Sequence, residues 1–369
     1  MSSLRRWGVV AAGVLVLVCL PSVVSRLPTS GSSLPAAQLL ARIQASANIG
    51  YSGYAESSGN LSLPVTTSQI SHVSDLLSSR TQLRIWWRSA ADWRVDAINL
   101  TGEHDTHQGP LGTWTWDYEA NTATLILKAP NEPIRLPESA DLVPASLARR
   151  LLSQAASDEV RRLPVARIAG HDATGLRLTP GDTQSSIDHV DVWALPASGL
   201  PVSVSVYAKG VSGSVFDTSL QDLATTMPDA SVTAFEPPPG ARIREQRAPD
   251  IVALMDQIAD IQPPRELAGL PVDAAIRHEG SVGVYGHGLT VLVAIPLPAR
   301  VAGPLDEQLE KLVGATRNKQ GVTVTVPPVA LLLSNQDVEG QAWLLAGTVT
   351  SATLTTAAAE LPPISEVSR

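Results

Sequence analysis

The sequence contains almost no cysteine. Cys19 is the single cysteine among 369 residues, and it lies within an apolar N-terminal run. The remainder of the chain can therefore form no intrachain disulfide, no cysteine-based zinc site and no cysteine nucleophile. Positive charge is also in short supply, since 27 Lys and Arg stand against 35 Asp and Glu, which gives a net charge of −8. Sequence-independent binding to nucleic acid needs a basic surface, so no nucleic-acid partner is expected.

Aromatic residues are scarce and unevenly distributed. They make up 4% of the chain, as 8 Trp, 5 Tyr and 2 Phe. One short stretch holds Trp86, Trp87, Trp93, Trp114 and Trp116. At this length, 44% hydrophobic residues are enough for one large core or two ordinary ones, which favours a folded protein over a disordered one.

The N-terminus has the pattern of an export segment. Arg5 and Arg6 precede an apolar run over residues 7–24, and no acidic residue occurs before Glu56. Eighteen helical residues span about 27 Å, close to the hydrocarbon thickness of a membrane, so length does not separate a signal peptide from an anchor. We predict that residues 1–26 are one of the two. The chain is then extracytoplasmic, and it is either anchored to the cell membrane or secreted after cleavage.

Two folded units follow a linker over residues 27–35. Helical spacing of apolar residues occurs over 36–47, 68–79 and 142–155, and strand-like alternation fills most of the sequence between them. Three prolines at 237–239 cannot supply ladder donors, so they mark the end of the first unit. We predict a first domain over 36–242, a linker over 243–249 and a small α+β domain over 250–363, which begins with a helix around 251–258.

Alternation of apolar and polar residues predicts an antiparallel sheet with one covered face. Leu83, Ile85 and Trp87 oppose Arg84, Trp86 and Arg88. Similar alternation occurs over 93–97, 114–118 and 125–127, and again over 175–179, 189–193 and 201–207. Residues 104–112 show none and are interpreted as a connection. Trp86 falls on the arginine face, where it stacks with Arg84 or Arg88 or marks a partner surface.

Several motifs resemble those of a known superfamily. Val190-Asp191-Val192-Trp193, followed by Ser198-Gly199-Leu200-Pro201-Val202, resembles the strand, turn and strand signature of the LolA and RseB/MucB superfamily. Trp114-Thr115-Trp116-Asp117-Tyr118 and Phe235-x-Pro-Pro-x-Gly-Ala are similar to motifs of the outer-membrane lipoprotein carrier-like proteins of high-GC bacteria, whose arginine-rich usage matches 23 Arg to 4 Lys. The resemblance covers residues 36–242, and the second unit is similar in element order to the small C-terminal domain of RseB-type proteins.

The resemblance implies an α+β fold: a half-open antiparallel β-barrel with covering helices, followed by the small domain. It also implies a binding protein for lipids or for the acyl chains of lipoproteins, or else a regulator that binds a membrane anti-sigma factor. The apolar strand residues then line a cavity, although the same residues could fill a core. The cavity candidates are Leu83, Ile85, Trp87, Trp93, Val95, Trp114, Trp116, Tyr118, Leu125, Leu127, Val190, Val192 and Val204.

Other polar clusters have simpler interpretations. His104-Asp105-Thr106-His107 offers two imidazoles and one carboxylate, but no third ligand is evident nearby, so we predict a polar connection and no metal. Asp188, His189 and Asp191 are interpreted as a solvated strand edge. Gly-rich segments at 210–214 and 283–288 lack the spacing of a nucleophile elbow or a dinucleotide site and are expected to be turns. No catalytic residue or cofactor is predicted, and the protein is not expected to be an enzyme.

Overall fold

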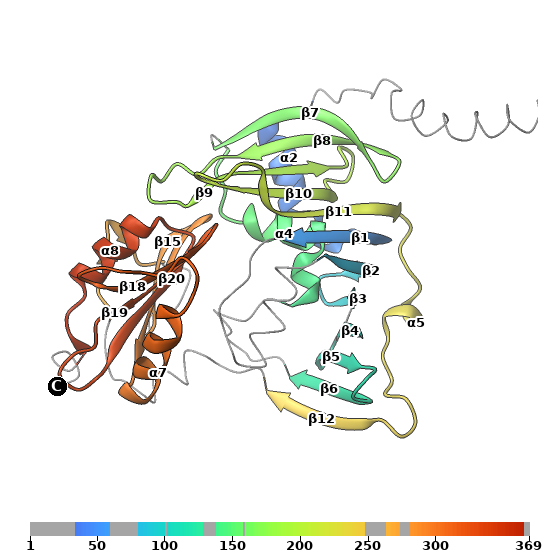
Figure 1. Ribbon diagram of the computed structural model, residues 1–369. Coiled ribbons are helices and arrows are strands. Elements are labelled where there is room, and N and C mark those ends of the chain that lie inside the picture. The colour runs from blue at the N-terminus through green and yellow to red at the C-terminus, as the bar shows by residue number, and fades with distance from the viewer. Residues whose placement is uncertain are drawn as a thin grey trace, which may run out of the picture.

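The computed structural model describes residues 34–59, 80–99, 102–127, 138–157, 159–247, 263–273 and 281–364. It contains a large sheet and, beside it, a smaller one (Figure 1). The predicted export segment 1–26 and the predicted helices at 68–79 and 251–258 lie outside the described residues. Among the residues that are described, no helix has the length and apolarity needed to cross a membrane.

The large sheet has twelve strands in the order β12-β6-β5-β4-β3-β2-β1-β11-β10-β9-β8-β7. Neighbouring strands are antiparallel except β12 and β6, which are parallel, and the two end strands do not pair with each other. The bounds are β1 Tyr51–Gly59, β2 Thr81–Ser89, β3 Asp92–Asn99, β4 Gly102–Gly109, β5 Gly112–Asp117, β6 Thr122–Leu127, β7 Val160–Ile168, β8 His171–Leu178, β9 Ile187–Ala194, β10 Pro201–Ala208, β11 Ser214–Ala224 and β12 Arg242–Arg247.

Helices cover the inner, concave face of this sheet (Figure 1). Leu39, Leu40 and Ile43 of α2 (Ala36–Gln44) are buried at helical spacing, as predicted. In α4 (Pro144–Leu151) a proline occupies the first turn, where its missing N–H is tolerated. The short helices η1 (Ser46–Asn48) and η2 (Ser139–Leu142) flank them. The helices α2 and α4 form one core cluster together with the inner-face side chains of the sheet. The prediction of an α+β fold with an open antiparallel sheet and covering helices is therefore confirmed.

The interpretation of residues 104–112 as a connection was wrong, because β4 occupies most of this segment. Both faces of β4 carry polar side chains, among them His104 and Thr106 on one face and Asp105 and His107 on the other, so no alternation marks it as a strand. Its pairing with β3 and β5 still satisfies the backbone donors and acceptors. Polar or irregular patterns also left β7 and β11 unpredicted.

A segment over residues 225–241, which we call the strap, carries the chain from β11 to β12. It contains the short helix α5 (Ala230–Thr233) and runs past the intervening strands to the far end of the sheet (Figure 1). There Asn121 donates to the carbonyl of Gly240, and β12 pairs with β6. Residues 243–247 of the expected linker thus belong to a strand of the large sheet. The division of the chain into two domains stays a prediction.

The smaller sheet forms a second α+β unit, with strand order β15-β16-β20-β19-β18-β17. Side chains from opposite faces of this sheet pack with α7 (Ala299–Glu310) in one cluster and with α8 (Ser351–Glu360) in another. The strand bounds are β13 Glu266–Leu267 and β14 Leu270–Pro271, which form a separate hairpin, β15 Gly283–His287, β16 Thr290–Leu297, β17 Thr316–Arg317, β18 Gly321–Val326, β19 Val329–Ser334 and β20 Ala342–Gly347.

The two sheets meet through backbone bonds and through side-chain bonds, among them Ser186 to the Pro328 carbonyl and the Gly288 amide to Gln154. The segment before β9 forms an isolated antiparallel bridge between Ser185 and Val349. The Ser186 amide donates to the Thr348 carbonyl at 3.0 Å, and the Thr350 amide donates to the Gln184 carbonyl at 2.8 Å. These bonds join the end of β20 to the loop before β9.

The glycine of the signature turn is required by the packing of α2. Gly199 has a φ of +76°, and an added Cβ would lie 2.5 Å from the carbonyl carbon and oxygen of Arg42. We expect Gly199→Ala to lower the free energy of unfolding by about 1–3 kcal/mol from backbone strain alone, and by more because α2 must move. Urea unfolding followed by far-UV circular dichroism measures the loss. Gly210→Ala is the matched control, since Gly210 has the same φ of +76° but nothing within 4 Å of its added Cβ. Equal losses in the two variants would show that contact with α2 is not the cause.

Candidate binding site on the outer face of the large sheet

Strand register divides the tryptophans between the two faces of the sheet. Trp87 is opposite Trp93 in the β2–β3 pair, whereas Trp86 is opposite Arg94. Arg94 is in turn opposite His107, and His107 is opposite Trp114. Directly opposed residues in antiparallel strands point to the same face. Trp86 and Trp114 therefore share one face, and Trp87 and Trp93 share the other.

Eight of the thirteen cavity candidates lie on the inner face. They are buried and belong to the core cluster that includes α2 and α4. Trp87 stacks on Trp93 with ring centroids 5.6 Å apart, and its Nε1 donates to the carbonyl of Ala47 at 2.8 Å. The guanidinium of Arg149 in α4 lies 5.1 Å from the Trp87 ring centroid. The inner-face members are Leu83, Ile85, Trp87, Trp93, Val95, Val190, Val192 and Val204.

The other five candidates belong to the outer, convex side. Trp114 and Trp116 are on the outer face of β5, and Leu125 and Leu127 follow on β6, because Leu125 is opposite Trp114. Tyr118 lies in the turn after β5, is 55% exposed and contacts the Trp116 ring edge-on. The single apolar wall predicted from alternation is thus split between two faces.

Trp86, which the alternation left among arginines, belongs with this outer group. The cation over its ring is Arg94, whose guanidinium carbon lies 5.1 Å from the ring centroid, rather than the predicted Arg84 or Arg88. Alternation along one strand shows which residues of that strand share a face. It does not show which residue of the next strand lies opposite.

The strap supplies the aromatic side chain that covers this face. Phe235 packs against three rings, with centroid distances of 4.8 Å to His107, 5.5 Å to Trp114 and 6.4 Å to Trp116. At the start of the strap, Arg88 donates to the Pro228 carbonyl. Phe235 was part of a family motif in the sequence, but nothing there indicated that it would contact β4 and β5.

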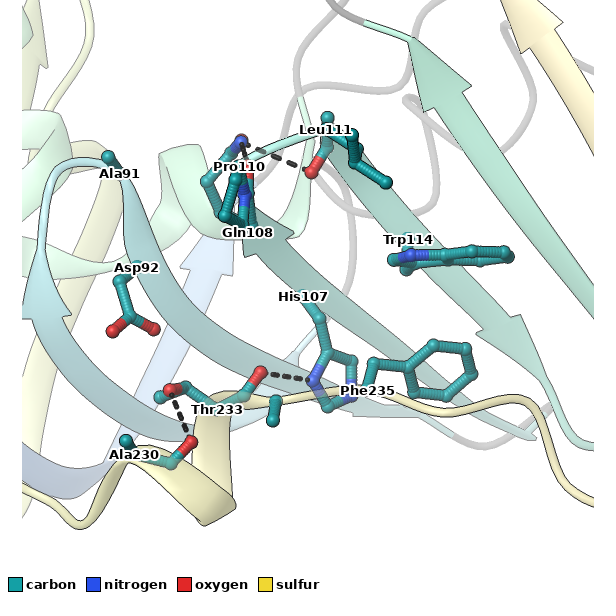
Figure 2. A pocket seen from close by; sticks show the side chains of 13 residues that line it. Ala91, Asp92, His107, Gln108, Pro110, Leu111, Trp114, Ala230, Thr233 and Phe235 are labelled. Carbon is teal, nitrogen blue, oxygen red and sulfur yellow. Dashed lines mark hydrogen bonds between the residues drawn. The ribbon is translucent and has the colours of Figure 1, made fainter.

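A pocket of about 420 Å³ opens between the strap and the β4–β5 hairpin (Figure 2). We call it the strap pocket. Most of its lining side chains are apolar: Ala91, Pro110, Leu111, Trp114, Ala230, Ala234 and Phe235. Leu111 stands at the hairpin turn and is 71% exposed. Asp92, His107, Gln108 and Thr233 complete the lining side chains.

Each polar side chain of the pocket forms at least one hydrogen bond within the protein. Gln108 Nε2 donates to the carbonyls of Gly109 and Gly112, and Gln108 Oε1 accepts from the Thr113 hydroxyl. Asp92 accepts from Arg88 at 2.7 Å. His107 Nδ1 lies 3.0 Å from the Thr233 carbonyl, and because a carbonyl only accepts, this nitrogen carries the proton (Figure 2).

A buried charged cluster adjoins the pocket on the same face. Arg94 Nε and Nη2 donate to the two oxygens of Asp96 at 2.6 and 2.8 Å, and Nη2 also donates to Asp105 Oδ2 at 3.1 Å. Burial, together with the neighbouring Asp96 carboxylate, raises the pKa of Asp105 to about 7 against the opposing effect of Arg94. Burial also lowers the pKa of His107, so the imidazole is neutral at pH 7.

The predicted solvated edge at 188–191 is not an edge. β9 lies between β8 and β10, and Asp191 is 3% exposed. Both carboxylate oxygens of Asp191 accept from Arg177, each at 2.5 Å. His189 stacks on Tyr207 with ring centroids 4.2 Å apart. These residues form a structural ion pair and an aromatic contact on the outer face of the sheet.

Comparison with known proteins gives similarity at the level of structure. No family model matches the chain, and no curated protein matches its sequence. The structure of the Pseudomonas aeruginosa MucA/MucB complex contains a chain that is 16% identical, with a TM-score of 0.49 over 88% of this chain and 96% of that one. A LolA superfamily protein from Nitrosomonas europaea is 9% identical, with a TM-score of 0.24 over 55% of this chain and 99% of that one.

Proposed function

We propose that this chain is an extracytoplasmic binding protein, not an enzyme, and that it takes an acyl chain of a lipid or an acylated protein into the strap pocket. One observation carries the proposal: the pocket is open and largely apolar, and the polar side chains in its lining are hydrogen-bonded within the protein. A ligand therefore gains little from new hydrogen bonds there. What the pocket offers is apolar surface.

The volume and the chemistry suit an acyl chain. Ligand pockets commonly have volumes of about 300–1,000 Å³, a range that includes the strap pocket. Each methylene removed from water contributes about 0.8 kcal/mol before the costs of association. Phe235 from the strap and Trp114 from the sheet pack against each other, with ring centroids 5.5 Å apart, and together form a rigid apolar part of the lining. An inner-face acyl cavity stays a prediction, and the described part of that face packs against α2 and α4.

A substitution at the mouth of the pocket tests this function. Leu111→Glu places a carboxylate beside the apolar lining, and because Leu111 is 71% exposed the variant should fold. We expect residues 27–369 to bind a fluorescent fatty-acid probe saturably. The variant should bind the probe at least about tenfold more weakly, since an apolar chain that removes water from the new carboxylate costs more than about 1.4 kcal/mol. Fluorescence titration measures both affinities.

Val313→Glu provides the matched control, because Val313 is exposed as well and belongs to the second unit. It should leave probe binding unchanged. Absence of saturable binding in the parent protein would reject the proposed function. Equal affinities of Leu111→Glu and the parent would place the binding site elsewhere.

A second candidate is a regulator that binds a membrane anti-sigma factor, as the sequence resemblance implies. Exposed apolar side chains around β5 and β12 favour it: Leu111 is 71%, Tyr118 is 55% and Ile243 is 64% exposed. Crosslinking in cells should then recover a membrane protein with an anti-sigma domain, with lower yield from Ile243→Glu. Recovery of no membrane protein would exclude this candidate.

A further inference from the structure

Three ligand-type side chains meet on the outer face of β3 and β4, next to the strap pocket. Asp96, Asp105 and His107 each offer one ligand atom, and these atoms lie within 4.8 Å of one another. The residues are 1%, 3% and 3% exposed, so the cluster is not a set of solvated surface acids. Asp96 is directly opposite Asp105 in the β3–β4 pair. The pairing of β3 with β4 thus brings Asp96 to Asp105 and His107 as a third possible ligand.

One oxygen of the cluster has no hydrogen-bond partner within the described part of the chain. Asp105 Oδ2 accepts from Arg94, but Asp105 Oδ1 is buried and unpaired. Buried carboxylate oxygens are ordinarily satisfied, because an unpaired acceptor loses its hydration without compensation. The unpaired oxygen belongs to a residue that is only 3% exposed, and a bound cation would satisfy it.

His107 has the orientation that metal-binding histidines adopt. Its Nδ1–H donates to the Thr233 carbonyl at 3.0 Å, which leaves the lone pair on Nε2 (Figure 2). Imidazole ligands usually donate their other ring N–H to a carbonyl or carboxylate in this way, which fixes the tautomer and the ring direction. Thr233 is the last residue of α5, so the strap itself holds the ring in place.

The net charge of the cluster also favours a cation. With both carboxyl groups ionised, Asp96 and Asp105 contribute −2, and Arg94 contributes +1. Arg94 holds both oxygens of Asp96, yet each carboxylate oxygen has a second lone pair, and ligating carboxylates are commonly hydrogen-bonded by a second group. Arg94 is therefore compatible with metal binding as the group that orients the two carboxylates.

We propose that Asp96, Asp105 and His107 bind a divalent transition-metal ion. One imidazole and two carboxylates suit Zn²⁺ or Mn²⁺ better than a soft metal, and three protein ligands leave a position for water. The ion links β3 and β4 and, through the His107–Thr233 bond, steadies the strap beside the pocket. This proposal does not depend on acyl binding, because the three metal-binding side chains can hold the ion whether or not the strap pocket is occupied.

Zinc titration of the full chain tests the site. The protein is purified in detergent, stripped with EDTA and titrated with Zn²⁺ in a calorimeter. We expect one equivalent to bind, with affinity at least tenfold lower in Asp105→Asn and in His107→Gln. His104→Gln is the matched control, since His104 is on the same strand but on the opposite face, and it should bind as the parent does. No stoichiometric binding by the parent, or equal affinities in all variants, would overturn the proposal.

X-ray absorption on the zinc-loaded parent gives a test that needs no variant to fold. The proposed ligands predict a shell of oxygen atoms with a single imidazole. A shell with two or more imidazoles, or with none, would place the ion at other residues and overturn the assignment.

Discussion

Replacement of Trp87 by alanine is expected to lower the free energy of unfolding by about 3–5 kcal/mol, the range for removing a buried large aromatic side chain. Trp87 is 4% exposed, stacks on Trp93 and Tyr51, and lies under the guanidinium of Arg149. Removing its indole would leave a cavity in the contact between the sheet and α4. Urea unfolding of the large sheet, followed by far-UV circular dichroism, measures the loss.

Trp86→Ala is the matched control. Trp86 is the adjacent residue on the same strand, but it is half-buried on the outer face, where its main contact is the Arg94 guanidinium. We expect less than half the loss found for Trp87→Ala. Similar losses in the two variants would contradict the division of the tryptophans between two faces.

Arg94→Ala is expected to cost about 3–5 kcal/mol, because it removes the cation that pairs with two buried carboxylates. The side chains of Asp96 and Asp105 are 1% and 4% exposed, and Asp96 accepts both of its bonds from this one guanidinium. Without Arg94 a charged Asp96 stays buried and uncompensated. Thermal and urea unfolding of metal-free protein measure the effect.

Arg84→Ala provides the comparison for this cluster. Arg84 pairs with Glu103 at 3.5 Å on the same face, but the two side chains are 53% and 33% exposed. A pair so accessible to water contributes about 0–1 kcal/mol. Adding Asp96→Asn to Arg94→Ala should recover part of the lost stability, since it removes the unpaired charge. If Arg94→Ala is no worse than Arg84→Ala, the cluster is not a buried ion-pair network.

Local sequence patterns predicted the parts of the fold in which burial is one-sided. Leu83, Ile85 and Trp87 alternate with polar residues and form the inner face of β2, and Leu39, Leu40 and Ile43 mark α2. The turn at Gly199 was recognised from its resemblance to the family signature, and its φ of +76° explains why a glycine stands there. Each of these signals depends on residues close together in the chain, so neighbours in sequence carry the information.

β4 and the site beside it were not predictable in the same way. Asp105 and His107 alternate with Thr106, and all three are polar, so no hydrophobic period distinguishes the strand from a loop. The apolar residues Trp114 and Trp116 were predicted to join Trp87, because alternation shows that a face is apolar without showing which face it is. The strap, more than a hundred residues later in the sequence, covers them with Phe235.

The sequence by itself determined the strands with a one-sided apolar alternation, the two principal helices of the first unit, the glycine turn and the antiparallel α+β class. Only the tertiary structure decided which side of the sheet each tryptophan occupies and which residues meet at the outer face. The physical reason is that the side-chain period depends only on the residues of one strand. Strand register and coverage by the strap depend instead on contacts between segments that are far apart in the sequence. Asp96 joins Asp105 and His107 only because β3 pairs with β4, and His107 is oriented only because Thr233 lies beside it.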